Sequence, residues 1–355
     1  GRDDLLMTGK VPIPSKTDSW GAEQELQGSS GAKLRFQMWF RDEPLVSHQE
    51  QQNMYMDLNE TIFSLERGDT RHGADKASLM YKKVDGNSKA IFYIPGRGDT
   101  FMHPHVLQLF LDNDFDLYTL DSRRCGRCIK YLDDPRMSHH SDDFDEYFEE
   151  FDLALNFMKA QKDYTKVVGY MHSTGAPMLV NYIMKNGDDA FSAFIMNGPF
   201  LDWGHGAPEA VLDNAAGHLL HVARFFGEEN PVFEAGTGIS TFTSKIWLNY
   251  RQSFDARPLQ AAHVTVGWCA AVSAVHSELG RRAGTGVTTK PTFVISSKAD
   301  TVLEHEESVV HASYVNKNPV IHQLTHNSHD VTLSVTSEYN EEALKVIDGF
   351  LKQAS

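Results

Sequence analysis

The stretch from Thr165 to Leu179 constrains the fold most, because it changes from a strand pattern to a helix pattern within a few residues. Val167 and Val168 are β-branched and follow a turn-like segment, which predicts a short buried strand. From Gly175 onward, apolar residues recur at helical spacing. Ser173 lies between the two patterns. This order predicts a serine on a sharp turn at a helix N-terminus, with its hydroxyl exposed and backbone amides nearby.

Two interpretations of this turn are open from these residues alone. A G-x-S-x-G nucleophile elbow would present Ser173 as a catalytic nucleophile. A Ser-Thr-Gly helix cap would carry no chemistry, and such caps are common. Met171 stands where the pattern has its first glycine, a position that normally needs a small side chain. The rest of the chain has to decide between them.

Length and composition limit the protein class. With 355 residues, the chain suits an α/β core that carries an inserted segment. The apolar content is sufficient for a large core, and no run of 18 apolar residues predicts a membrane span. A net charge of −15 argues against nucleic acid or an anionic membrane as the main partner. The first residues lack the apolar stretch of a signal peptide, which slightly favours the cytoplasm but leaves the compartment open.

Strand and helix patterns alternate through most of the chain, which predicts an α/β fold with a mostly parallel central sheet and helices on both faces. Further strands are expected at Leu34–Phe40, Ala90–Ile94, Phe115–Leu120, Phe194–Met196, Thr292–Ser296 and Pro319–Leu324. Helices are expected at Pro104–Leu111, Asp142–Gln161, Val264–Arg281 and Glu338–Lys352. Residues 41–76 are polar with some helical spacing around Met54, Leu58 and Ile62, and indicate an excursion from the core.

The expected domain organisation has four parts. Residues 1–24 have no periodicity and are expected to wrap the surface. Residues 25–203 form the first part of the core and residues 263–355 the second. Residues 204–262 break the βα rhythm and are rich in aromatic side chains, which predicts a lid over the strand ends, where α/β enzymes bind ligands. An additional packing layer is the alternative.

Three short motifs carry other possible chemistry. His139, His140 and the aspartates at 142, 143 and 145 are metal-ligand types, but acidic residues also favour a helix N-terminus, here that of Asp142–Gln161. Cys125 and Cys128 form a C-x-x-C, which lacks the second ligand pair of a zinc site. Arg97-Gly98-Asp99 matches a cell-adhesion tripeptide, although it directly follows an expected buried strand.

Ser173, Asp300 and His329 each follow the end of an expected strand, in the order Ser…Asp…His. Parallel strands present their carboxyl ends at one edge of a sheet, so these residues are expected to meet. The histidine would remove the serine proton, and the aspartate would hold its tautomer. His172, His322 and His326 are rival bases, and Asp330 is a rival carboxylate. The three loops together favour the nucleophile elbow over the helix cap.

The chain resembles α/β-hydrolases of the serine aminopeptidase or monoacylglycerol-lipase-like group, from about residue 30 to 352. The likeness is carried by Pro95–Asp99, Asp121–Arg127, His172–Gly175, Asn197–Trp203 and Lys298–Asp300. It implies an oxyanion hole formed by the backbone amides of Arg97 and Thr174, and it makes the two cysteines ordinary loop positions. Two departures are Pro95, where the family has histidine, and Met171.

These observations predict a serine hydrolase that cleaves a carboxylic ester through an acyl-enzyme on Ser173. A small-molecule ester with a short to medium acyl chain is the expected substrate, because Met171 would shorten the pocket. No metal or organic cofactor is implied, and the oligomeric state is open. The alternatives are an acyltransferase, an amidase or peptidase on the same triad, or a non-catalytic binding protein. Epoxide or haloalkane hydrolysis would require Asp where Ser173 stands.

Overall fold

A computed structural model describes residues 24–27, 33–36, 50, 53–54, 57–66, 73, 75–204, 232–234, 263–334 and 336–354. Most of the expected lid lies outside these residues, as does the expected N-terminal wrapping segment up to residue 23. The domain boundaries therefore stay predictions. Two short antiparallel pairs lie outside the central sheet: β1 (Gln24–Gln27) with β2 (Lys33–Phe36), and β9 (Val232–Glu234) with β10 (His263–Thr265).

The centre of the molecule is an eight-stranded sheet in the order β12-β11-β8-β7-β5-β6-β4-β3. Its strands are β3 (Asn59–Ser64), β4 (Lys76–Lys82), β5 (Lys89–Ile94), β6 (Phe115–Asp121), β7 (Lys166–His172), β8 (Ala193–Asn197), β11 (Thr292–Ser297) and β12 (Val320–Leu324). The six strands from β12 to β6 pair in parallel, and β4 pairs antiparallel with both β6 and β3. The expected α/β class and mostly parallel sheet are confirmed.

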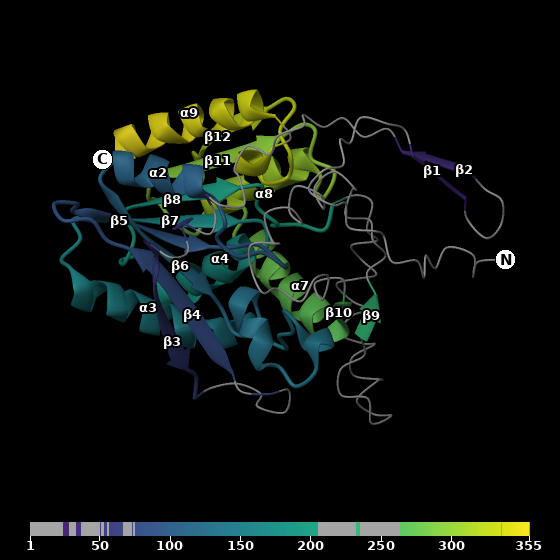
Figure 1. Cartoon of the computed structure of the whole chain (residues 1–355), viewed down its shortest axis with the longest axis horizontal. Helices are drawn as coiled ribbons and strands as arrows, with labels where there is room; N and C mark the ends of the chain where they lie inside the picture. Colours follow the sequence, from purple (N-terminus) through teal and green to yellow (C-terminus); the bar gives the residue numbers. More distant parts are fainter. Residues whose placement is uncertain are drawn as a thin grey trace.

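Helices cover both faces of the sheet (Figure 1). On one face lie α2 (Pro104–Asp112) and α9 (Ser337–Ala354); on the other lie α3 (Phe148–Gln161), α4 (Gly175–Asn186) and α7 (Val266–Arg281). Strand alternation divides the apolar side chains between these layers: Ile91 and Tyr93 pack on the first face, and Phe92 and Ile94 on the second. All four are at most 1% exposed, so strand β5 is buried on both sides, as parallel strands are.

Several sequence predictions need correction. Helical spacing around Ile62 is misleading, because Asn59–Ser64 is strand β3, paired along its length with β4. Strand β4 and helix α8 (His305–Val315) were not expected. The expected strand at Leu34–Phe40 is seen at Lys33–Phe36, and the residues after it lie outside the description. The expected helix Asp142–Gln161 begins as a 3₁₀ turn, η5 (Phe144–Tyr147), before α3.

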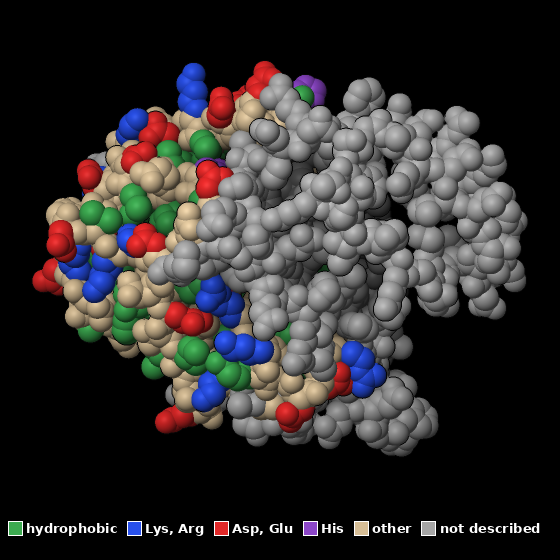
Figure 2. Space-filling view, viewed as in Figure 1, with side chains coloured by type: hydrophobic (Ala, Val, Ile, Leu, Met, Phe, Trp, Pro, Cys, Tyr) green, Lys and Arg blue, Asp and Glu red, His purple; other side chains and the backbone are tan. Residues whose placement is uncertain are grey.

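The surface and helix lengths bear on possible partners. Figure 2 shows Lys and Arg side chains interspersed with Asp and Glu over the described part of one face, without a large area of one sign. Within the described ranges, none of the helices combines the length and apolar character needed to cross a bilayer. Strand β12 forms one edge of the sheet, and its Val320 and Ile321 are 56% and 40% exposed.

Candidate active site

Ser173 lies on a tight turn between β7 and α4. Its φ of +50° is in the left-handed region, which costs a non-glycine residue of order 1–3 kcal/mol. The turn is held by three backbone hydrogen bonds. Ser173 N–H donates to the Asn197 carbonyl at 3.1 Å, and the Ser173 carbonyl accepts the Ala176 and Phe200 N–H groups at 3.0 and 3.1 Å. Such a strained strand-to-helix turn is the geometry expected of a nucleophile elbow.

The close approach of strand and helix occurs at Gly175 rather than at Met171. A Cβ on Gly175 would lie 2.4 Å from the Ile94 carbonyl oxygen, so only glycine fits there. Met171 instead points into the core between the sheet and helices α3, α4 and α7, where it is fully buried. Met171 does not line the pocket described below, so it cannot shorten that pocket in the way the sequence predicts.

Asp300 and His329 lie in contact in the loops that follow β11 and β12. His329 Nδ1 is 2.7 Å from Asp300 Oδ2, and the other carboxylate oxygen accepts the Val302 and Leu303 N–H groups at 2.7 and 3.1 Å. With Nδ1–H donating to the carboxylate, Nε2 carries the lone pair. That Nε2 is buried and has no hydrogen-bond partner among the described residues. A buried nitrogen left without a partner is costly in a folded protein and needs an explanation.

The electrostatics of the pair favour ionised forms of both groups. Burial lowers the pKa of His329, but the charge of Asp300, its hydrogen bond and the charges of Asp330 and Asp99 raise the pKa above its ordinary value on balance. Burial raises the pKa of Asp300, but the charge and hydrogen bond of His329 and the two backbone N–H groups lower it overall. The imidazole is therefore a stronger base than a free histidine.

Two glycines bring neighbouring loops against this pair and the elbow. A Cβ on Gly96 would lie 3.0 Å from the Ser173 Cβ, so the loop that follows β5 passes directly over the elbow. A Cβ on Gly198, whose φ is +50°, would lie 2.7 Å from the His329 carbonyl oxygen and 3.2 Å from its ring. Gly96 thus places Arg97 beside the elbow, and Thr174 directly follows Ser173. Arg97 and Thr174 come from different loops and line one pocket, and their role in an oxyanion hole stays a prediction.

A small pocket opens between these two positions. It is lined by Arg97 and Thr174 together with Tyr147, Met178 and Trp268. The Arg97 guanidinium stacks over the Trp268 ring with 4.9 Å between its central carbon and the ring centroid, and burial lowers its pKa to about 10. It remains a cation at neutral pH, held against an aromatic face.

His139 is a contributor to the site that the sequence did not reveal. Gly98 N–H donates to its Nε2 at 2.8 Å, and this hydrogen bond holds the loop that carries Arg97. His139 is itself held at φ +61°, and its N–H donates to the Arg124 carbonyl at 2.9 Å. The only available signal was the His139-His140 pair, which the sequence offered as a possible metal ligand.

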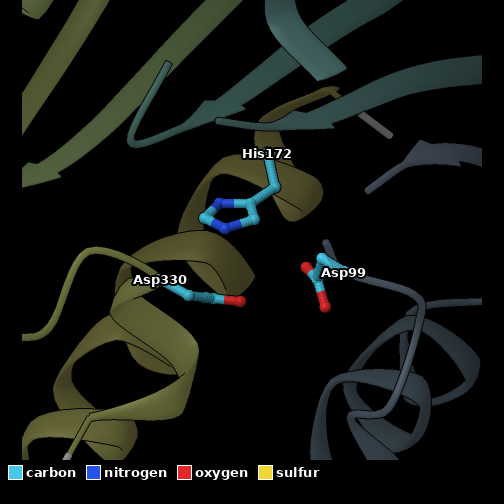
Figure 3. A group of neighbouring side chains, drawn as sticks. All are labelled: Asp99, His172 and Asp330. Carbon is cyan, nitrogen blue, oxygen red and sulfur yellow. The ribbon is translucent and has the colours of Figure 1, made fainter. Parts of the chain in front are cut away.

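The rival residues have other contacts. The His172 ring lies 5.0 Å from the His329 ring between centroids, and its Nδ1 is 3.0 Å from the Asn197 carbonyl oxygen. His326 stacks against Tyr339, and His322 lies on edge strand β12. Asp330 does not contact the His329 ring through any described hydrogen bond. It faces His172 and Asp99 instead (Figure 3).

The His-Asp run, the adhesion tripeptide and the C-x-x-C pair do not form a metal, adhesion or reactive-thiol site in the described residues. His140 Nδ1 is 2.8 Å from the Thr265 hydroxyl, and the Asp143 side chain accepts the Asp145 N–H as a helix cap. Asp99 is 6% exposed, which removes the adhesion interpretation. In the described ranges, ligand atoms converge only in Asp99–His172–Asp330 and in Asp202–Glu307–His311, neither of which includes the suspected run 139–145. Burial raises the pKa of the Cys125 and Cys128 thiols well above the ordinary value, so both are inert.

Comparison with known proteins gives a family and a fold. A family model described as serine aminopeptidase, S33, matches residues 87–333. A soluble variant of monoglyceride lipase from Saccharomyces cerevisiae, solved with a substrate analog, is 14% identical, with 84% of this chain and 95% of that chain covered and a TM-score of 0.61. A thermostable carboxyl esterase from Bacillus coagulans, solved with glycerol, is 12% identical, with 84% and 99% covered and a TM-score of 0.61.

A monoacylglycerol lipase from Paleococcus ferrophilus is a third similar structure. It is 15% identical, with 84% of this chain and 100% of that chain covered and a TM-score of 0.56. No protein of curated function matched. At these identities the solved structures show a shared fold, and the chemistry has to be argued from the site.

Proposed function

Because the chain belongs to the serine aminopeptidase S33 family of α/β-hydrolases, we propose that it hydrolyses a carboxylic ester through an acyl-enzyme on Ser173. The observation that carries this proposal is the Asp300–His329 pair. Its 2.7 Å contact fixes the imidazole tautomer and leaves a buried Nε2 without a described partner. Such a nitrogen suits a general base that has to accept a proton from a nearby hydroxyl.

In the proposed mechanism, Ser173 Oγ attacks the ester carbonyl while His329 Nε2 takes its proton. Asp300 stabilises the imidazolium that forms and does not itself accept the proton. The amides of Arg97 and Thr174 stabilise the oxyanion, because they follow the glycine that approaches the elbow and the nucleophile itself. His329 then returns the proton to the leaving alcohol. Water, activated by the same nitrogen, releases the acid.

Replacement of the nucleophile tests the proposal most directly. Ser173→Ala should lower kcat for p-nitrophenyl esters by roughly three to six orders of magnitude while the fold is kept. Wild-type protein should also be labelled by a fluorophosphonate at Ser173, and the variant should not. Ser192→Ala is the matched control, because Ser192 lies just before β8, at the amino ends of the strands, and its hydroxyl accepts the Val167 N–H at 3.4 Å. Ester hydrolysis near the wild-type rate in Ser173→Ala would refute the assignment.

His329 should act as a unit with the nucleophile. His329→Ala and Ser173→Ala should each be about as damaging as the double variant, since either one removes the same step. Losses that multiply in the double variant would assign the two residues to separate functions. Adding an alcohol or amine acceptor and measuring ester or amide products against free acid separates hydrolysis from acyl transfer.

We also propose a preference for short to medium acyl chains. The pocket beside Thr174 is small and closed by Met178 and Trp268, both of which are at most 5% exposed. Each buried methylene contributes about 0.8 kcal/mol, so kcat/KM should rise roughly fourfold per carbon until the pocket is full. Kinetics on C2 to C16 esters check this, and Met178→Ala should move the optimum to longer chains. A wild-type rate that climbs up to C16 would contradict the short pocket.

A further inference from the structure

Asp330, the residue after the proposed base, has a carboxylate with an unusual set of donors. It is 5% exposed. Its Oδ1 accepts the Asn197 Nδ2–H at 2.8 Å, the Thr332 N–H at 2.9 Å and the Thr332 hydroxyl at 2.7 Å. Its Oδ2 lies 2.9 Å from His103 Nε2. Four donors from three separate segments therefore converge on one buried charge and hold these segments together.

The contact between His103 and Asp330 has a defined direction. Met102 N–H donates to His103 Nδ1 at 3.1 Å, so Nδ1 carries the lone pair. The proton is therefore on Nε2, which donates to Asp330. His103 caps helix α2 and ends the loop that begins at Pro95. Asp330 thus ties the loop with the proposed oxyanion position Arg97 to the loop with His329.

Asn197 extends this connection to the elbow. Its side chain donates to Asp330, and its backbone carbonyl accepts the Ser173 N–H at 3.1 Å. The same carbonyl lies 3.0 Å from His172 Nδ1. Its Oδ1 accepts the Val331 N–H at 3.3 Å. A continuous set of hydrogen bonds therefore runs from the Ser173 backbone, through Asn197, to the residue covalently joined to His329.

We propose that Asp330 is a positioning residue for the reaction at Ser173: it fixes the His329 loop relative to the elbow and the Arg97 loop, and it adds a second negative charge behind the imidazole. This proposal rests on the ester hydrolysis proposed above. No described hydrogen bond joins Asp330 to the His329 ring or to the Ser173 side chain, so Asp330 acts through the position and charge environment of His329. Asp300 remains the carboxylate that orients the ring.

The charges around His329 make the electrostatic part testable. Asp300 faces Nδ1 from the loop after β11, Asp330 and Asp99 lie on the loops after β12 and β5, and the His172 ring packs against it from the end of β7. The charges of Asp300, Asp330 and Asp99 each raise the pKa of His329. The pKa of His172 is lowered to about 4, chiefly by burial, so His172 is neutral at working pH. Loss of the Asp330 charge therefore moves the His329 pKa downward.

The test compares Asp330→Asn with Asp116→Asn. Asp116 is a matched control because it lies at the amino ends of the parallel strands, away from the proposed site. Asp116 is also buried and also accepts four hydrogen bonds, from Val84 N–H, Asn87, Lys162 and Tyr164. Asp330→Asn should lower kcat for p-nitrophenyl esters by about 10²-fold with little change in KM, because a small displacement of His329 suffices for that loss. The lower-pH limb of kcat/KM should also shift to lower pH. Asp116→Asn should leave kcat and the limb unchanged.

A milder variant covers the case in which Asp330→Asn does not fold. Thr332→Val removes one hydroxyl donor to Asp330 and keeps the side-chain shape, and should lower kcat by about threefold to tenfold. Folding is checked by circular dichroism, and fluorophosphonate labelling reports Ser173. If the Asp330→Asn protein folds and keeps the wild-type kcat and the wild-type lower-pH limb of kcat/KM, while Ser173→Ala is inactive, the positioning role alone is overturned. A loss of kcat with an unmoved limb would reduce Asp330 to a structural residue. Full activity of Ser173→Ala would instead overturn the proposed hydrolysis.

Discussion

A buried aspartate that accepts four hydrogen bonds lies at each end of the parallel strands, Asp116 at the amino ends and Asp330 at the carboxyl ends, yet the donors differ in kind. At the amino ends of the parallel strands, Asp116 accepts the Lys162 ammonium at 3.1 Å, so its charge is balanced by a cation. At the carboxyl ends, Asp330 accepts only neutral amide, hydroxyl and backbone donors apart from His103. In the described part of the chain no lysine or arginine pairs with Asp330. Its charge is left to act on the neighbouring histidines.

This difference indicates how one fold separates stability from reactivity. At the amino ends, Lys162 also donates to the carbonyls of Val84 and Asn87, so it joins β6 to the loop between β4 and β5. The carboxyl edge instead keeps a left-handed serine, a histidine nitrogen without a described partner and a carboxylate without a matched cation. The left-handed serine and the histidine nitrogen without a described partner each cost folding free energy, and sites of reaction are where proteins retain such costs. The pKa of Asp330 is well below its ordinary value despite burial, so its charge is favoured in the folded protein.

Replacement of the orienting carboxylate should have the largest effect. Asp300→Asn should lower kcat for ester hydrolysis by about 10⁴-fold, because the amide no longer holds the Nδ1–H tautomer of His329. Steady-state kinetics check the loss, and near-normal binding of substrate should remain. If Asp300→Asn were mild and Asp330→Asn crippling, the two carboxylates would have to exchange roles.

Filling the space beside the imidazole should have an intermediate effect. Gly198→Ala places a Cβ about 2.7 Å from the His329 carbonyl oxygen at a φ of +50°, so His329 must move. A displacement of this size should lower kcat by about 10²-fold. Gly187→Ala is a suitable control, since its φ is +84° but its Cβ would meet nothing within 4 Å. Equal losses in both variants would trace the effect to backbone strain and not to His329.

The pH profile should show a smaller but directional effect. The carboxylates around His329 raise its pKa above the ordinary value of 6.5. The general base has to be neutral, so kcat/KM should rise with pH and reach half its plateau above pH 6.5. Measurement of kcat/KM between pH 5 and about 9 checks this. A half-maximal value clearly below the ordinary histidine range would show that burial dominates over the carboxylates.

The smallest effect on activity is expected for Asp116, at the amino ends of the parallel strands. Asp116→Asn removes a buried charge that accepts the Val84 N–H and the side-chain donors of Asn87, Lys162 and Tyr164. It should lower the free energy of unfolding by roughly 2 kcal/mol while kcat stays at the wild-type value. Denaturant unfolding and ester kinetics on one preparation measure both. A large loss of kcat in a folded protein would erase the contrast between the edges.

The sequence anticipated those features that depend on local patterns. Strand alternation and flanking turns located β5, β6, β7, β8, β11 and β12, and the position of Ser173, Asp300 and His329 after three of these strands followed from their order along the chain. The family resemblance and the α/β class were confirmed by the family match and the sheet. The triad and the oxyanion positions stay predictions, which the geometry supports.

Features that depend on contacts distant in sequence could not be anticipated. Strand β3 has a polar, exposed pattern, and only its pairing with β4 makes it a strand. The contact of His139 with Gly98 joins residues 41 positions apart, and that of His103 with Asp330 joins residues 227 positions apart. No period or motif reports such pairs. The sequence therefore presents Asp330 only as a rival to Asp300, although it shows that Asp330 is next to His329.

The burial of every thiol has a practical consequence for labelling experiments. The chain has three cysteines, and Cys125, Cys128 and Cys269 are all buried. Burial raises the pKa of Cys269 to about 11 and those of the other two further, so none is an effective nucleophile toward a maleimide at neutral pH. A single cysteine introduced at an exposed position, such as Val310→Cys, can therefore carry a fluorophore or spin label without removal of the native thiols.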